Sequence, residues 1–156
     1  MPSPRPDGAT IRPARPCDRP RIEAIVADAY GKYVPRIGQE PGPMLDNYAE
    51  KIAAGRVHVI ERDGAILGYA VLIAQADAML LDNVAVAPEA QGMGLGRRLL
   101  EWAEAQARAA GFSRIRLYTN AAMTENIALY GRIGYAETHR ATEKGLNRVY
   151  MAKPLG

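Results

Sequence analysis

Three glycines alternate with other residues where a strand-like segment of the sequence gives way to a helix-like segment. The run Gln91-Gly92-Met93-Gly94-Leu95-Gly96-Arg97 follows the apolar stretch 79–86 and leads into the helical pattern 95–110. Glycine allows tight turns in which backbone N–H groups point inward, and the start of a helix adds partial positive charge. This combination predicts a loop that binds phosphate groups, with Arg97 and Arg98 adding charge at its rim.

Two common glycine-rich nucleotide loops do not fit this segment. A P-loop needs Lys followed by Ser or Thr after its last glycine, whereas Arg97-Arg98 stands there. In the dinucleotide fingerprint G-x-G-x-x-G/A, the last position is Arg97 when the count starts at Gly92, and Leu99 when it starts at Gly94. No acidic residue ends the next strand, where a ribose partner is expected. A strand-to-helix turn without a ligand remains the alternative for the loop taken alone.

The elements before the loop are expected to be helical first and then extended. Six of the eleven prolines fall within residues 1–20, so residues 1–10 are expected to be an extended or flexible lead-in, followed by a short edge strand at 11–14. Asp18 is expected to cap a helix that ends at Gly31. Prolines and glycines interrupt 31–45, and Asp46 is expected to cap a second short helix that ends near Gly55.

The remaining segments alternate between strand and helix patterns. Strands are expected at 57–61, 66–73, 79–86, 113–118, 135–141 and 148–152, and helices at 95–110 and 125–132. The pair Asp63-Gly64 predicts a hairpin turn. The order predicts a single α/β domain over residues 1–156, in which helices cover one mixed sheet.

Composition limits the function classes. The chain has 156 residues, of which 48% are apolar and 24% charged, as in ordinary globular proteins. The net charge of +3 comes from scattered basic residues without a basic run, so no nucleic-acid partner is expected. No apolar stretch has the length of a membrane span or a secretory signal. A lone Cys17 cannot form an internal disulfide, and we expect a cytoplasmic protein.

Two signatures in the sequence resemble those of the GNAT-type N-acetyltransferase superfamily. Gln91-x-x-Gly94-x-Gly96 resembles the family's Q/R-x-x-G-x-G/A pyrophosphate loop, and 83–88 resembles the strand before it. The segment 126–135 resembles the second signature, N-x-x-A-x-x-x-Y-x-x-x-G-[FY], in slightly compressed form. The resemblance covers roughly residues 57–153. It implies a mostly antiparallel sheet of six to seven strands, splayed at a coenzyme A cleft and flanked by about four helices.

The same resemblance implies acetyl-CoA as co-substrate and assigns its contacts. The pyrophosphate is expected on the main chain of the loop, and the pantetheine arm on the strand before it and on the second signature. The expected binding residues are Val84, Ala85, Val86, Gln91, Gly92, Met93, Gly94, Leu95, Gly96, Arg97, Asn126 and Tyr130. The backbone N–H near Val86 is expected to face the thioester oxygen.

Acetyl transfer to an amine needs a base for the amine and a donor for the departing thiolate. Cys17 has no neighbouring histidine, so we expect direct attack by the amine in a ternary complex rather than a covalent intermediate. By the resemblance, Tyr130 stabilises the thiolate; its alternative role is a core aromatic. Asp82 is the candidate base, acting directly or through water; its alternative role is a structural carboxylate. His58 and His139 have no companions at metal-ligand spacing, so no metal is expected.

The acceptor is not identified by the sequence. Residues Tyr30, Tyr33, Asn83 and Tyr118 are expected to contact it, and Tyr118 stands where some family members have a glutamate base. A small-molecule amine is the first expectation, and a protein N-terminus or lysine is the second. A non-catalytic acyl-CoA-binding module is the alternative from another class. A homodimer is possible, and the choice between acetyl and longer acyl groups stays open.

Overall fold

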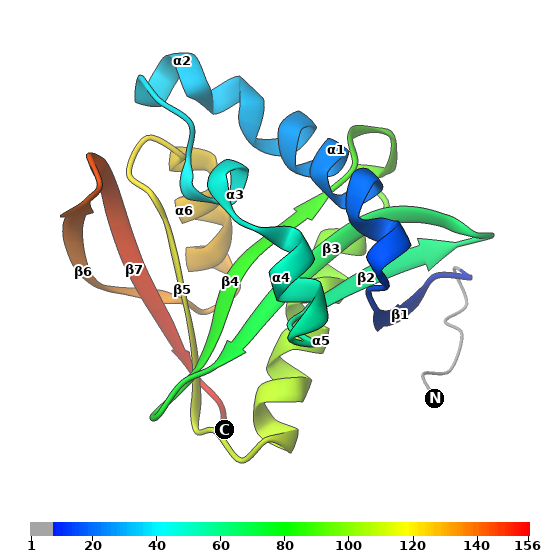
Figure 1. Cartoon of the computed structure of the whole chain (residues 1–156). Helices are drawn as coiled ribbons and strands as arrows, with labels where there is room; N and C mark the ends of the chain where they lie inside the picture. Colours follow the sequence, from blue (N-terminus) through cyan, green and yellow to red (C-terminus); the bar gives the residue numbers. More distant parts are fainter. Residues whose placement is uncertain (1–7) are drawn as a thin grey trace.

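The computed structural model describes residues 8–156 and contains one seven-stranded sheet with helices on both faces (Figure 1). The strand order is β1-β2-β3-β4-β5-β7-β6. The strands are β1 (Thr10–Pro13), β2 (Val57–Arg62), β3 (Ala65–Ala74), β4 (Met79–Val86), β5 (Arg114–Asn120), β6 (Ala136–Glu143) and β7 (Leu146–Pro154). The helices are α1 (Arg19–Tyr30), α2 (Val34–Ile37), α3 (Gly42–Leu45), α4 (Tyr48–Ala53), α5 (Leu95–Ala109) and α6 (Thr124–Arg132), with 3-10 turns η1 (Pro16–Asp18), η2 (Gly31–Tyr33) and η3 (Pro88–Ala90).

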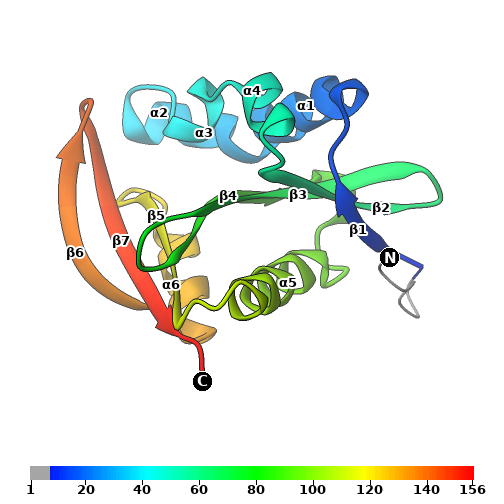
Figure 2. The ribbon, with the colours of Figure 1, turned by 60° about the horizontal axis from the view of Figure 1, so that its bottom comes forward.

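The helices form two layers, one on each side of the sheet. Figure 2 shows α1 to α4 above strands β1 to β4, with α5 beneath them. Each layer closes its own apolar core: Ile22 and Ile25 of α1 pack on one face, and Leu99 and Ala103 of α5 pack on the other. Burial of these apolar stripes holds the helices to the sheet. Strands β7 and β6 form the end of the sheet beyond β5, and β6 is exposed along most of its length.

The sheet is antiparallel except where β4 meets β5. These two strands run parallel, and their register covers only Met79–Leu81 against Ile115–Leu117. Both strands continue beyond those pairs, β4 to Val86 and β5 to Asn120, without pairing to each other. The sheet therefore splits into a wedge at this end, as the family resemblance implied.

The fold class and the order of elements are confirmed, and two helix caps are corrected. Asp18 occupies the N-cap position of α1 but makes no side-chain cap; its carboxylate instead accepts hydrogen bonds from Arg12 and from the Arg15 backbone. The cap of α4 is Asn47, whose side chain accepts from the Glu50 N–H. Asp46, which we expected to be this cap, instead faces the sheet and accepts a hydrogen bond from Asn83 of β4.

The N-terminal expectation falls partly outside the described residues, which begin at Gly8. Within the described part, Ala9 is already buried and β1 starts at Thr10. In residues 8–156, none of the helices combines the length and the apolar character that a bilayer crossing requires.

Candidate active site

The glycine loop adopts the conformation that only glycine takes up without strain. Gly92 and Gly94 have φ values of 86° and 77°, and a Cβ at either position would meet open space. The requirement for glycine is therefore one of backbone conformation rather than of room. Gly94 is also the N-cap of α5, which has no side-chain cap, so the first N–H groups of the helix remain available to an anion.

A cleft of about 410 Å³ opens beside this loop. Its cationic side chains are Lys32 at one end and Arg97 at the loop, which favours an anionic ligand. The cleft runs between β4 and α6, along the wedge in the sheet. Its lining residues are Ala29, Tyr30, Lys32, Tyr33, Val84, Ala85, Val86, Gln91, Gly96, Arg97, Leu100, Asn126, Leu129, Tyr130 and Ile133.

The edge of β4 that faces the wedge offers backbone groups to a ligand. Ala87 donates its N–H to the Leu67 carbonyl of β3 at 2.8 Å. Because backbone groups alternate between the two sides of a strand, those of Val84 and Val86 point away from β3, towards the wedge. The hydroxyl of Tyr30 donates to the Val84 carbonyl at 3.0 Å. Among the residues that the structure describes, none bonds the Val84 N–H or the backbone groups of Val86, so these groups are left for an extended ligand.

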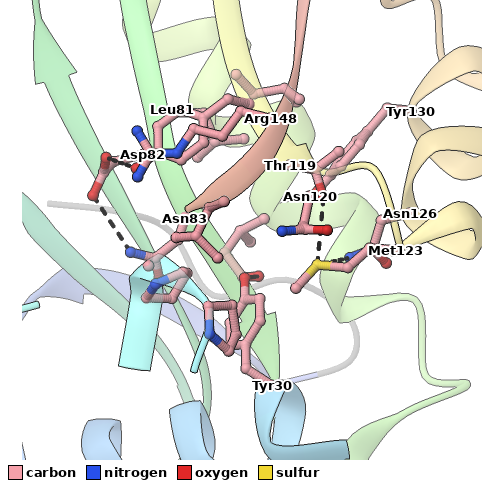
Figure 3. A pocket seen from close by; sticks show the side chains of 17 residues that line it. Tyr30, Leu81, Asp82, Asn83, Thr119, Asn120, Met123, Asn126, Tyr130 and Arg148 are labelled. Atoms are coloured by element: carbon pink, nitrogen blue, oxygen red, sulfur yellow. Dashed lines mark hydrogen bonds between the residues drawn. The ribbon is translucent and has the colours of Figure 1, made fainter. Parts of the chain in front are cut away.

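A second, narrower cavity of about 40 Å³ lies on the other side of the wedge (Figure 3). Figure 3 shows that its walls come from distant elements, with Tyr30 on α1, Asp82 and Asn83 on β4, Asn120 on β5, Tyr130 on α6 and Arg148 on β7. Pro41, Gly42 and Pro43 at the start of α3 close one side.

Four residues line both the cleft and the cavity. They are Tyr30, Val84, Asn126 and Tyr130. The two spaces therefore meet at the point where β4 leaves β5. A ligand lying in the cleft and a second ligand in the cavity would touch there, which is the geometry of a transfer reaction between two substrates.

Tyr130 stands at this junction as a neutral hydrogen-bond donor. Its ring packs edge-on against Tyr135, with 5.9 Å between ring centroids. Loss of hydration, and then the nearby Tyr33, raise the pKa of Tyr130 to about 12. The phenol is therefore protonated at neutral pH. A phenol with this pKa is a weaker acid than an ordinary thiol, so it suits hydrogen-bond stabilisation of a thiolate better than full proton transfer.

Asp82 projects from a bulge in β4. The register shifts between Val71 and Leu72 of β3, which leaves Asp82 as the extra residue. Its side chain is only 8% exposed. Oδ1 accepts a hydrogen bond from the Tyr118 hydroxyl at 3.0 Å, and Lys51 Nζ lies 3.5 Å from Oδ2. A carboxylate with these two partners is held in one place beside the cavity.

Asn83 links Asp82 to Asp46 and leaves one oxygen unsatisfied. Its Nδ2 donates long hydrogen bonds of 3.5 Å to Oδ2 of Asp46 and to Oδ2 of Asp82. This fixes the amide orientation, and the buried Oδ1 has no partner within residues 8–156. Burial, followed by the charge of Asp82, raises the pKa of Asp46. An amine N–H in the cavity is a suitable partner for the free oxygen.

Most of the residues expected at the site line the cleft or the cavity. The residues expected to contact the acceptor are shared between the two spaces instead of lying together in one. Tyr30, Asn83 and Tyr118 line the cavity, whereas Tyr33 lines the cleft alone. Gly92, Met93 and Gly94 are exposed on the loop, and Leu95 is buried under it.

Arg148 and Asn120 are among the lining residues of the cavity that were not expected from the sequence. Arg148 covers the ring of Tyr118, with 4.5 Å from its guanidinium carbon to the ring centroid. Asn120 lies near the end of the cavity where Thr119 contacts Met123. Finding Arg148 from the sequence would have required the register of β7 with β5, which places it opposite Asn120.

The remaining reactive side chains have local structural roles. Cys17 is exposed in η1 and lines neither space. His58 lies against Trp102 at 4.6 Å, and its burial lowers the pKa of the imidazole. Across residues 8–156, no three His, Cys, Asp or Glu side chains are grouped as metal ligands.

Comparisons with known proteins agree with this geometry. The model of the Acetyltransferase (GNAT) family matches residues 21–135. An "IAA acetyltransferase" of Azospirillum brasilense is 34% identical over 104 residues, which cover 64% of this chain and 68% of that protein. Mouse N-alpha-acetyltransferase 80 is 38% identical over 73 residues, 45% of this chain and 22% of that protein.

Solved structures share the fold at lower identity. The ribosomal-protein-S18-alanine N-acetyltransferase from Escherichia coli superposes with a TM-score of 0.71 at 23% identity, over 95% of this chain and 94% of that one. A PaiA N-acetyltransferase from Thermoplasma acidophilum, in complex with coenzyme A, gives a TM-score of 0.77 at 16% identity, over 94% and 98%. With both signatures in place around the wedge, the chain belongs to the GNAT acetyltransferase family and is an N-acetyltransferase by class.

Proposed function

We propose that the protein transfers the acetyl group of acetyl-CoA to the primary amine of a small molecule, by direct attack in a ternary complex. The observation that carries the proposal is the junction of cleft and cavity at Tyr30, Val84, Asn126 and Tyr130. The cleft has the phosphate-binding loop at one end and free β-strand backbone along its side, which suits a pyrophosphate joined to an extended amide arm. The cavity suits the acceptor.

The co-substrate supplies an activated thioester, and the chain's own groups position the reactants. The loop N–H groups hold the pyrophosphate, and the open edge of Val84 and Val86 pairs with the pantetheine amides. The Val86 N–H is the donor for the thioester oxygen, where negative charge develops. These contacts bring the carbonyl carbon to the mouth of the cavity.

The transfer step then proceeds with one base and one donor. The amine lone pair forms the new C–N bond, and the C–S bond breaks to release a thiolate. Asp82, directly or through water, takes the proton that the amine nitrogen loses. Tyr130 donates a hydrogen bond to the thiolate, which finally takes up a proton. Asn83 Oδ1 accepts from the amine and orients its lone pair.

Three measurements test the proposal. Calorimetry should detect binding of acetyl-CoA, and free thiol should appear only when an accepted amine from a small-molecule panel is present. Initial rates at varied concentrations of both substrates should give intersecting double-reciprocal lines. Parallel lines, or a Cys17→Ser variant that loses activity, would show a covalent route instead.

The alternatives are separated by the same assays. Acetyl-CoA binding without thiol release for any amine or peptide would indicate a binding module. Thiol release with peptides alone would indicate a protein acetyltransferase. Absence of acetyl-CoA binding would overturn the proposal as a whole.

A further inference from the structure

A separate cleft of about 410 Å³ lies on the face of strands β5, β7 and β6. It is lined by Arg114 and Arg116 of β5, by Tyr150 of β7, and by Thr138 and His139 of β6, and none of these lines either space of the candidate active site. The cleft therefore needs its own explanation.

A row of three rings connects this cleft with the acceptor cavity. Tyr118, Tyr150 and His139 lie opposite one another on three adjacent strands, so their side chains share one face. The ring centroids of Tyr118 and Tyr150 are 5.7 Å apart, and those of Tyr150 and His139 are 4.4 Å apart and nearly parallel. Tyr118 lines the acceptor cavity, whereas Tyr150 and His139 line the separate cleft, so the row of rings extends from one site to the other.

Arg116 lies beside this row and lacks a partner. It precedes Tyr118 by two residues, so it projects from the same face of β5. Its Nε is shielded from solvent and has no hydrogen-bond partner, and within residues 8–156 no carboxylate pairs with its guanidinium. Its neighbours are paired: Arg114 with Asp77 at 2.7 Å, and Arg148 with Glu143 at 3.1 Å.

A guanidinium N–H that is shielded from water without a hydrogen-bond partner costs free energy, and an anionic ligand that accepts this hydrogen bond removes the cost. The planar fork of arginine matches the oxygens of a carboxylate or phosphate and can bind them bidentately. Arg114 at the rim is ion-paired with Asp77, and the Thr138 hydroxyl donates to the Tyr150 carbonyl at 3.2 Å, so Arg116 is the cation available to an anion. The cleft thus combines one unsatisfied cation with a row of aromatic rings.

We propose that this cleft binds an oxoanion, either carboxylate or phosphate, that the acceptor amine itself carries. The proposal rests on the acetyl transfer proposed above. Two residues along β5 span about 7 Å, so the acid group is held well away from the amine at Tyr118. The carboxylate of a simple α-amino acid lies one carbon from the nitrogen and cannot reach. The acceptor class is an elongated amine with a distal acid group.

The anion site can be tested without turnover. Inorganic phosphate, titrated at constant ionic strength into the 15N-labelled full chain, should shift the Arg116 Nε–H signal and the backbone amides of Thr138 and Tyr150 saturably. Arg116→Gln should abolish the amide shifts. The control Arg140→Gln removes the same charge from an arginine that is paired with Glu137, and should leave them intact. No saturable shift in the wild type would overturn the site.

A matched pair of amines tests whether the acceptor brings the anion. In the CoA-loaded protein, 6-aminohexanoate should bind at least about tenfold more tightly than 6-aminohexanamide by the same shifts, and Arg116→Gln should remove the difference. Equal affinities, or phosphate binding without competition by 6-aminohexanoate, would overturn the acceptor assignment in favour of a free anion. Failure of the proposed acetyl transfer would appear separately, as absence of acetyl-CoA binding, because the phosphate titration uses no co-substrate.

Discussion

The hydroxyl of Tyr118 donates a 3.0 Å hydrogen bond to Oδ1 of Asp82, across the gap where β5 and β4 have parted. Burial, and then the charge of Asp82, raise the pKa of Tyr118, so the phenol stays protonated and remains a donor. The tyrosine therefore holds the candidate base in place.

Tyr118→Phe removes this donor and should lower turnover. The Asp82 carboxylate loses the hydrogen bond that fixes its position, so kcat should fall about tenfold. Asp82→Asn should lower kcat about a hundredfold or more, as expected for loss of a general base. Unchanged kcat in both variants would assign Asp82 a purely structural role. Circular dichroism checks that the variants fold.

Tyr130→Phe should lower turnover while acetyl-CoA binds as before. The ring keeps its packing against Tyr135, and only the donor to the thiolate is lost. We expect kcat to fall by about ten- to a hundredfold, with a Kd for acetyl-CoA within about twofold of the wild type by calorimetry.

The pH dependence provides a second check on Tyr130. Because its pKa is raised to about 12, the phenol stays protonated at lower pH, and its ionisation should not reduce kcat between pH 6 and 10. A basic limb in that range which Tyr130→Phe abolishes would contradict the assignment.

Gly94→Ala should weaken co-substrate binding through the backbone. An alanine at φ 77° is strained by about 1–2 kcal/mol, and relief of that strain would turn the loop N–H groups away from a phosphate. We expect a Kd for CoA at least about tenfold higher.

Gly64→Ala is the matched control for this loop variant. Gly64 has φ 80° in the β2–β3 hairpin, and a Cβ there also meets open space. The two variants should lose similar stability in thermal melts, but only Gly94→Ala should lose CoA affinity. Equal affinities in both would argue against the loop as the phosphate site.

Gly68→Ala should destabilise the fold by about 1–3 kcal/mol, the usual cost of overpacking. A Cβ at Gly68 would lie 2.8 Å from the Ala85 carbonyl and 3.3 Å from Leu99. The β3–β4 pair and α5 would have to move apart. Chemical denaturation with urea measures the loss, and an unchanged midpoint would contradict the tight approach of these elements.

Features set by neighbouring residues were predictable from the sequence. The strand at 79–86 and the start of α5 at Leu95 were placed correctly, and the hairpin turn at Asp63-Gly64 adopts the positive φ values that its sequence favours. The loop was predictable because its glycines determine its backbone locally. The seven strands follow the expected order.

Features set by distant contacts were not predictable. Asp46 looked like a helix cap, but its partner Asn83 is 37 residues away, and Asn47 caps the helix instead. The strands at 114–120 and 146–154 are longer than expected, because polar residues such as Asn120 and Asn147 pair across the sheet. The bulge at Asp82 depends on the register with β3, which no local pattern encodes.

The wedge between β4 and β5 has a consequence for the stability of the whole fold. The two halves of the sheet are joined by the short parallel pairing of β4 with β5. Beyond it, the amides of a bound ligand can make the backbone hydrogen bonds that the two strands do not make with each other. A bound thioester would therefore be a structural member of the sheet as well as a reactant. The protein's resistance to unfolding should rise and fall with the supply of acetyl-CoA around it.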